Sequence, residues 1–284
     1  MLIAQITDIH LGFEPDDPRE RNRRRLDATL AALAAMTPRP DLLLMTGDLA
    51  DAGDDDLAYR RLKEALADLP FPAWPLAGNH DGRACFAAHF PACVAVDGFA
   101  HYAIDAGPLR ILALDTMEEG RHGGAFCAAR AAWLEARLAE QPERPTLLAL
   151  HHPPVDSGLS WMGENGEADW VARMEAVVSR HGNVAGLVAG HLHRPLATRF
   201  AGTILTVCAA TAPQLVLDIG RVDPEAPDGR PLIVEEPPAF ALHLWTGRAL
   251  VSHFGRVGDD PVLARFDGRM QPLVRLLASE RRVG

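Results

Sequence analysis

Histidine and aspartate side chains gather in five short blocks of this sequence, and each block follows an apolar stretch that resembles a buried strand. The blocks are Asp8-Ile9-His10, Gly47-Asp48-Leu49-Ala50-Asp51, Gly78-Asn79-His80-Asp81, His151-His152-Pro153-Pro154 and Gly190-His191-Leu192-His193. Carboxylate, amide and imidazole groups are ligands for transition-metal ions. Because several strand ends of one sheet can bring distant residues to one point, the five blocks together predict a metal site.

Two of the blocks contain ligand pairs with a spacing of two residues. In extended chain, residues two apart project to the same side, so Asp8 and His10 can hold one divalent ion. The same spacing lets His191 and His193 face one site, and Gly190 permits a close approach of the backbone there.

The second and third blocks supply groups of different chemistry. The carboxylate of Asp48 has two oxygens and can bridge two metal ions, while Gly47 allows a sharp turn just before it. Asn79 offers a carbonyl oxygen as a neutral ligand. His80 is a candidate catalytic group that faces the substrate as a proton donor or a positive hydrogen-bonding group.

The remaining acidic and imidazole groups have less specific assignments. His151 and His152 point opposite ways from a strand end, so only one is expected to be a primary ligand. Asp51 and Asp81 either orient ligand imidazoles or are ordinary polar turn residues. The histidines outside the blocks are expected to be surface or core residues: His89, His101, His122, His181, His243 and His253.

The composition favours a globular protein with a substantial core and an acidic balance of charge. The chain has 284 residues, 48% of them hydrophobic, which is enough for a large core. Its net charge is -10 with a pI near 5.6, which argues against a general nucleic-acid binder. A small phosphate ester is still compatible with this charge, because bound cations can reverse the local field.

The cysteines and the N-terminus suggest a cytoplasmic protein. Cys85, Cys93, Cys127 and Cys208 form no C-x-x-C pair, so we expect free thiols and neither a disulfide framework nor a zinc knuckle. The first residues have no basic and apolar leader pattern, and no run is long enough to span a membrane.

Strands and helices are expected to alternate through the first two-thirds of the chain. Periodicity predicts strands at 2–6, 42–46, 73–77, 146–150 and 184–189, and a hairpin of 100–104 with 110–114. It predicts helices at 20–36, 54–69, 126–140 and 168–180. The arginine-rich stretch 19–25 is expected to be a solvated helix face. This alternation predicts an α/β sandwich.

The last third changes character. Antiparallel strands are expected at 203–207, 240–245 and 249–254, a surface loop at 222–238 and a helix at 270–282. We therefore divide the chain into a catalytic core at 1–215 and a C-terminal part at 216–284. The C-terminal part either completes the sandwich or contributes to a homodimer or higher homo-oligomer.

Taken together, the blocks D-x-H, G-D, G-N-H-D, H-x-P and G-H-x-H resemble those of the calcineurin-like metallophosphoesterases, over residues 8 to 193. The resemblance implies a four-layer α/β-β/α sandwich with two central mixed sheets. It assigns Asp8, His10, Asp48 and His193 to one metal ion, and Asp48, Asn79, His151 and His191 to a second. His151 is preferred over His152 because it stands two residues before Pro153. His80 would lie beside the leaving group.

Within this superfamily, the motifs favour phosphodiester hydrolysis. Two cations bridged by Asp48 would neutralise phosphoryl oxygens and lower the pKa of bound water, and the hydroxide formed would attack phosphorus in line. Protein phosphatases usually carry G-N-H-E, whereas this chain has Asp81 at the last position. The sequence is most similar to bacterial class III cyclic-nucleotide phosphodiesterases and to glycerophosphodiesterases. The alternatives are a phosphomonoesterase or nucleotide pyrophosphatase, and a non-catalytic scaffold.

The expected partners are two divalent or mixed-valence metal ions and a small phosphodiester. Iron and manganese are favoured, with zinc or cobalt also compatible with nitrogen and oxygen ligands. No nucleic-acid polymer is expected as a partner. The loop 155–169 either covers the substrate with Trp161 or packs Trp161 beneath itself.

Overall fold

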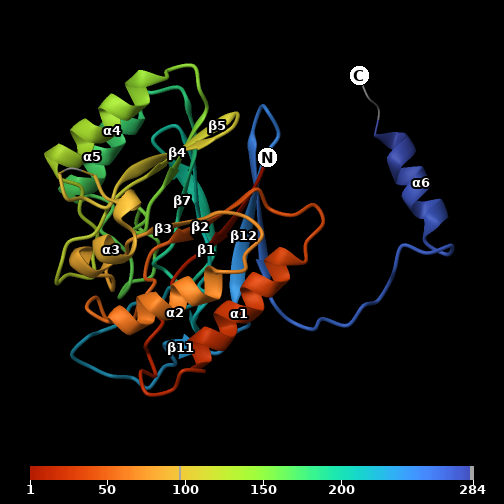
Figure 1. Ribbon diagram of the computed structural model, residues 1–284, viewed down its shortest axis with the longest axis horizontal. Helices are drawn as coiled ribbons and strands as arrows, with labels where there is room; N and C mark the ends of the chain where they lie inside the picture. Colours follow the sequence, from red (N-terminus) through yellow and green to blue (C-terminus); the bar gives the residue numbers. More distant parts are fainter. Residues whose placement is uncertain (96, 282–284) are drawn as a thin grey trace.

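Two mixed β-sheets form the centre of the protein, in a computed structural model that describes residues 1–95 and 97–281 (Figure 1). The first sheet has the strand order β13-β12-β1-β2-β3. Its strands are β1 (Leu2–Ile6), β2 (Leu42–Thr46), β3 (Ala73–Leu76), β12 (Ala239–Trp245) and β13 (Leu250–Arg256). β1, β2 and β3 run parallel, whereas β12 pairs antiparallel with both β1 and β13.

The second sheet has the order β4-β5-β6-β7-β9-β8. Its strands are β4 (Tyr102–Ala106), β5 (Leu109–Ala113), β6 (Thr146–Ala149), β7 (Val184–Ala189), β8 (Leu196–Phe200) and β9 (Thr203–Val207). β5, β6, β7 and β9 are parallel, and antiparallel β4 and β8 form the two edges. A short separate pair joins β10 (Gln214–Leu215) to β11 (Ile233–Val234).

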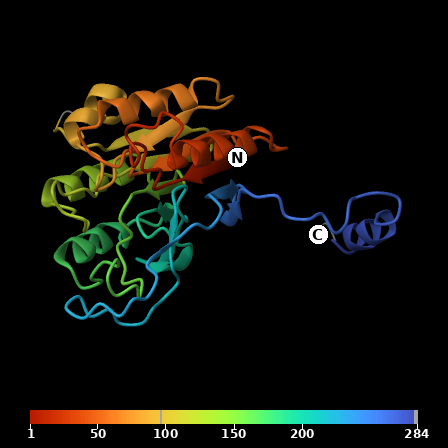
Figure 2. The same cartoon turned by 90° about the horizontal axis from the view of Figure 1, so that it is seen from below.

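Helices cover the outer face of each sheet. The helices are α1 (Arg21–Ala34), α2 (Asp56–Leu66), α3 (Arg83–His89), α4 (Ala128–Glu140), α5 (Asp169–Val178) and α6 (Gln271–Glu280), with a short 3-10 helix η1 (Pro91–Cys93). The two views show α1 and α2 on one side of the sheets and α4 and α5 on the other (Figures 1 and 2). α6 stands apart from the body in both views.

The alternation of side chains along the central strands explains the four layers. Ile111 and Leu147 belong to the core between the two sheets, where they join residues of β1 and β2. Their neighbours Leu112 and Leu148 point the other way and join the core under α4 and α5. Since successive strand residues face opposite sides, one apolar strand serves both cores. The α/β sandwich with two mixed sheets is thus confirmed.

A buried polar cluster joins the sheets within the first core. The Gln5 side-chain amide donates to Thr46 Oγ1 at 2.8 Å and to the carbonyl of Ala189 in the second sheet at 2.9 Å. Its oxygen therefore accepts from His243 Nε2 at 2.9 Å, and Ser252 Oγ lies 2.8 Å from His243 Nδ1. Burial lowers the pKa of His243 to about 4, so this histidine is neutral in the core.

The elements differ from the expectations in detail. α2 begins later than expected because Asp55 caps it by accepting from the Ala58 N–H at 3.0 Å, and it ends at Leu66 instead of 69. β9 pairs antiparallel with β8, as expected, but it also pairs parallel with β7. The short α3, β8, β10 and β11 were not predicted. β11 lies within the segment expected to be a plain loop.

One arginine contradicts the expected solvated face at 19–25. Arg25 is 8% exposed, and its guanidinium donates to the carbonyl oxygens of Thr211, Ala212 and Glu236. It therefore ties α1 to the segments after β9 and before β12, a role that depends on tertiary structure. Among the described residues, no helix has the length and apolar character needed to cross a membrane.

Candidate metal centre

All seven predicted metal-binding residues converge where the two sheets place the ends of their parallel strands. Each of them lies two to four residues beyond the end of such a strand. The residues are Asp8, His10, Asp48, Asn79, His151, His191 and His193. Several subsets of these side chains, together with His80 and His152, bring their ligand atoms within 4.8 Å of one another.

The backbone at these positions adopts an unusual conformation. Positive φ values occur at Asp8, His10, Asp48, His191 and His193, between 50° and 72°. Non-glycine residues rarely adopt this left-handed conformation, and such strain clusters at functional sites. Outside this group, the non-glycine residue with a positive φ in the described chain is Ala201.

The carboxylate of Asp48 lies between two sets of imidazoles. Its Oδ2 is 3.7 Å from His10 Nε2 and 3.3 Å from His151 Nε2. Its other oxygen accepts from the backbone N–H of His80 at 2.8 Å. Burial acts to raise the pKa of the Asp48 carboxyl, but His151, His10 and His80 outweigh it and hold the pKa well below its usual value. Asp48 is thus an ionised, fixed carboxylate with histidines on both sides.

On one side of Asp48, Asp8, His10 and His193 form a ligand group. His193 Nδ1–H donates to the carbonyl of Pro213 at 2.8 Å, which leaves Nε2 as a bare acceptor 3.5 Å from Asp8 Oδ1. His10 Nδ1 lies 3.2 Å from Asp51 Oδ1. Its Nε2 faces His193 Nε2 at 3.3 Å.

On the other side, Asn79 and two histidines complete a second group. Asn79 Oδ1 is 3.1 Å from both His151 Nε2 and His191 Nδ1. His151 Nδ1–H donates to the carbonyl of Thr46 at 2.8 Å, so that its Nε2 is directed to the centre. Burial and the charge of His151 hold the pKa of His191 well below its usual value, which keeps that imidazole neutral.

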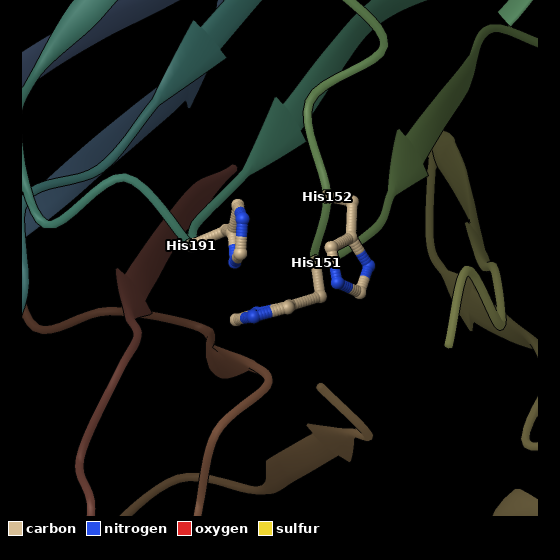
Figure 3. A group of neighbouring side chains, drawn as sticks. All are labelled: His151, His152 and His191. Atoms are coloured by element: carbon tan, nitrogen blue, oxygen red, sulfur yellow. The ribbon is translucent and has the colours of Figure 1, made fainter. Parts of the chain in front are cut away.

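His152 lies beside this group but has both ring nitrogens engaged. Figure 3 shows His151 and His152 on the segment after β6, with their rings close to that of His191. His152 Nε2–H donates to the carbonyl of His122 at 3.1 Å, and Nδ1 lies 2.9 Å from Thr116 Oγ1. His152 therefore packs against His191 at 4.6 Å between ring centroids and has no nitrogen free for a metal ion.

Two glycines of the motifs are required by close packing. A Cβ on Gly78 would lie 2.3 Å from Asp48 Oδ1 and 2.8 Å from His151 Nε2. A Cβ on Gly190 would lie 1.9 Å from Thr7 Oγ1. A larger residue at either position would therefore displace the groups that surround the centre.

Asp51 and Asp81 support the centre in different ways. Asp51 accepts from His10 through its side chain and from His80 Nδ1 through its backbone carbonyl, at 2.8 Å. Asp81 orients no imidazole; it accepts from the backbone N–H groups of Leu49, Ala50 and Gly78. The suggestion that Asp81 orients a ligand imidazole is therefore wrong, and its role is to fix the two loops that carry Asp48 and Asn79.

His122 was assigned to the surface or the core, but the structure places it at the centre. Its Nδ1 lies 3.2 Å from Asn79 Nδ2, and its ring is 5.5 Å from that of His80. Asn79 thus directs its oxygen to the histidines and its N–H to His122. No short motif marks His122, because it lies on the irregular segment between β5 and α4.

The donor set fits metal ions. At 3.3 Å, His10 Nε2 and His193 Nε2 cannot both present bare lone pairs to each other, so a proton or a cation must lie between them. Asn79 Oδ1 can only accept hydrogen bonds, so a proton or a cation must also lie between it and each of the nitrogens His151 Nε2 and His191 Nδ1. Asp8, His10 and His193, and separately Asp48 with His151, supply the nitrogen and oxygen donors that transition metals prefer.

Comparison with known proteins agrees with this geometry. Residues 1–195 match the calcineurin-like phosphoesterase family. The chain belongs to this family. It is 28% identical to a probable glycerophosphodiester phosphodiesterase of Arcobacter nitrofigilis, over 91% of this chain and 94% of that protein. It is 33% identical to a probable cyclic nucleotide phosphodiesterase of Rhodopseudomonas palustris, over 88% of this chain and 89% of that protein.

A solved structure shares the fold at low sequence identity. The dimetal phosphatase from Danio rerio superposes with a TM-score of 0.66 at 14% identity, over 92% of this chain and 98% of that one. At this identity the similarity concerns the fold. The family assigned from the motifs is therefore confirmed, together with its two-sheet architecture.

Proposed function

We propose that this calcineurin-like phosphoesterase hydrolyses small phosphodiesters of the cyclic-nucleotide or glycerophosphodiester type. The relatives of A. nitrofigilis and R. palustris carry these two activities in their names and align over nearly the whole chain. The observation that carries the proposal is the position of Asp48 Oδ2 between His10 and His151, where one carboxylate can serve two cations.

Two metal ions would be held by the two groups around Asp48. Asp8, His10, Asp48 and His193 would bind one ion, and Asp48, Asn79, His151 and His191 the other. When bound, such a pair neutralises phosphoryl oxygens and activates water for in-line displacement. Iron and manganese are the proposed metals, and zinc or cobalt would suit the same donors.

The protein's own groups position these ligands and handle a proton. Asp51 and the carbonyls of Thr46 and Pro213 fix the tautomers of His10, His151 and His193. His80 Nδ1–H donates to the carbonyl of Asp51, which leaves Nε2 to carry a proton to the leaving oxygen. His122 orients Asn79 and adds a second imidazole beside His80.

A phosphomonoesterase or nucleotide pyrophosphatase would use the same ligands, so the substrate class needs a direct test. The manganese-loaded protein is assayed with bis-p-nitrophenyl phosphate and with p-nitrophenyl phosphate. We expect the higher kcat/KM with the diester, and a higher value with the monoester would contradict the proposal. Asp48→Ala should abolish turnover of both substrates. If the protein is a non-catalytic scaffold, the wild type itself should turn over neither substrate.

The physiological diester is then identified within the proposed class. Cyclic AMP, a 2′,3′-cyclic nucleotide and glycerophosphodiesters are compared on the same metal-loaded sample. The loop 155–169 could contribute to the choice, since Trp161 is 40% exposed. A changed ratio of kcat/KM for two diesters in Trp161→Ala would support contact between Trp161 and the substrate. An unchanged ratio would contradict this contact.

A further inference from the structure

A second cluster of ligand groups lies outside the centre, between α2 and α3. Asp56 is the first residue of α2, while Cys85 and His89 lie on α3. Residues four apart in a helix share one face, so the thiol and the imidazole both project towards α2. One ligand atom from each of the three residues lies within 4.8 Å of the other two.

The histidine of this cluster is held in a fixed position. His89 Nε2 is 2.7 Å from Asp56 Oδ1, and the His89 ring stacks on Tyr59 at 5.3 Å with an interplanar angle of 16°. Tyr59 is anchored in turn, because its hydroxyl donates to Asp81 Oδ1 at 2.7 Å. The His89 side chain is only 11% exposed, whereas that of Asp56 is 57% exposed. The cluster is therefore rigid on the protein side and open towards solvent.

The charge around the thiol favours a cation. Three consecutive carboxylates, Asp54, Asp55 and Asp56, precede or begin α2 beside Cys85. Burial and then these carboxylates raise the pKa of the Cys85 thiol. A divalent cation would neutralise this local charge, and it is also what a thiolate requires as a partner there.

We propose that Asp56, Cys85 and His89 bind a zinc ion, with water or an outside ligand in the fourth position. Carboxylate, thiolate and imidazole are the zinc ligands of proteins, and zinc binds them in tetrahedral geometry. On binding, Cys85 would release its proton to solvent, and the ion would replace the proton shared by Asp56 and His89. The inference does not depend on the proposed phosphodiesterase activity.

Such an ion would stabilise the loops of the candidate metal centre indirectly. It would tie α2 to α3, and Tyr59 connects α2 to Asp81. Asp81 accepts from the N–H groups of Leu49 and Gly78, beside Asp48 and Asn79. The ion would therefore support the loops that carry Asp48 and Asn79 through Tyr59 and Asp81.

Cobalt substitution tests the proposal with a signal that the catalytic centre cannot give. The metal-free protein is titrated with Co²⁺, and the near-ultraviolet sulfur-to-cobalt charge-transfer band is recorded. The candidate catalytic centre supplies nitrogen and oxygen donors alone, so a band reports a cysteine ligand. We expect the band in the wild type and in His151→Ala, and its loss in Cys85→Ser. The matched control Cys127→Ser, which alters another partly buried free cysteine, should keep the band.

A second measurement keeps the proposal testable if Cys85→Ser folds poorly. In the His151→Ala background, zinc should raise the unfolding midpoint, and adding His89→Gln should reduce this rise; the part that stays comes from the ligand group of Asp8, His10 and His193. The proposal is overturned if Co²⁺ gives no charge-transfer band, or if the band survives Cys85→Ser. It is equally overturned if zinc stabilises the protein to the same extent with and without His89→Gln.

Discussion

Asp51 holds His10 through its side chain, with Oδ1 3.2 Å from His10 Nδ1. The same residue holds His80 through its backbone carbonyl. A substitution of the Asp51 side chain therefore tests the role of His10 alone. It removes the hydrogen bond to His10 and leaves the backbone contact with His80 in place.

Asp51→Asn should weaken metal binding. Loss of a carboxylate that orients a ligand histidine typically costs about 10–100-fold in metal affinity or activity. The measurement is the manganese concentration that restores half-maximal activity to the metal-free protein. Asp54→Asn, an exposed carboxylate three residues away, is the matched control and should behave as the wild type. Equal metal requirements for both variants would show that Asp51 does not act through His10.

His80→Ala should lower kcat by about 10²–10⁴-fold, as expected for a lost general acid. The loss should be smaller with bis-p-nitrophenyl phosphate than with an alkyl diester, because p-nitrophenolate needs little protonation to leave. Metal content, measured by elemental analysis, should stay the same. If both substrates lose activity equally, His80 does not donate to the leaving oxygen.

Removal of metal should destabilise the protein as well as inactivate it. Without cations, the close approach of His10 Nε2 and His193 Nε2 and the buried carboxylates Asp8 and Asp48 depend on protons for neutralisation. Chelation should therefore lower the unfolding midpoint at neutral pH, and manganese should restore it. In Asp48→Asn the effect of manganese on the midpoint should be reduced; an undiminished effect would place the ions elsewhere.

His243 should make stability depend on pH between 6.5 and 4. The pKa of His243 in the folded protein, about 4, lies below the ordinary 6.5. Below pH 6.5 this histidine therefore binds a proton in the unfolded chain but stays neutral in the folded protein. Stability is lost as the pH falls, by up to about 3 kcal/mol near pH 4. Denaturant unfolding at several pH values should show a flatter profile in His243→Gln than in wild type. His253→Gln should keep most of the pH dependence, because burial is the larger cause of the lowered pKa of His243 and the charge of His253 the smaller one.

The C-terminal tail should be dispensable for the fold of the body. α6 has no buried residue and stands apart from the sheets, as Figure 1 shows. Deletion after residue 257 should leave the unfolding midpoint and kcat/KM unchanged. A lower midpoint would mean that the tail contacts the body or a second copy in solution. The homo-oligomer and the boundary at residue 215 stay predictions.

The elements that build the site could be predicted because their patterns are local. β1, β2, β7 and β9 have the predicted bounds. β1, β2 and β7 are short runs that the chain buries on both faces, whereas β9 is buried only from Leu205 onwards. The site residues lie just beyond such strands, where motif spacing is informative. β8 was missed because three of its five residues are exposed, and α3 because it has seven residues with Phe86 as its one buried side chain.

Residues whose roles come from tertiary contacts could not be predicted in this way. In the sequence, Arg25 resembles the neighbouring helix-surface arginines. In the structure it donates to the carbonyl oxygens of Thr211, Ala212 and Glu236. His122 is in no motif, and its place beside Asn79 depends on the segment after β5. Glu164 helps to hold that segment, because it accepts from the N–H of Gly124. Sequence spacing carries no information about such distant partners.

The pairing of β1 with β12 affects the order of events during synthesis. β1 lies between β2 and β12, so the strand that leads to Asp8 and His10 meets its second neighbour only after residues 239–245 have been translated. At about 5–20 residues per second, a nascent chain waits at least ten seconds with that edge unpaired. The strand that leads to Asp8 and His10 therefore reaches its final pairing only after β12 has been made, and the open β1 edge is the point at which a chaperone would be needed.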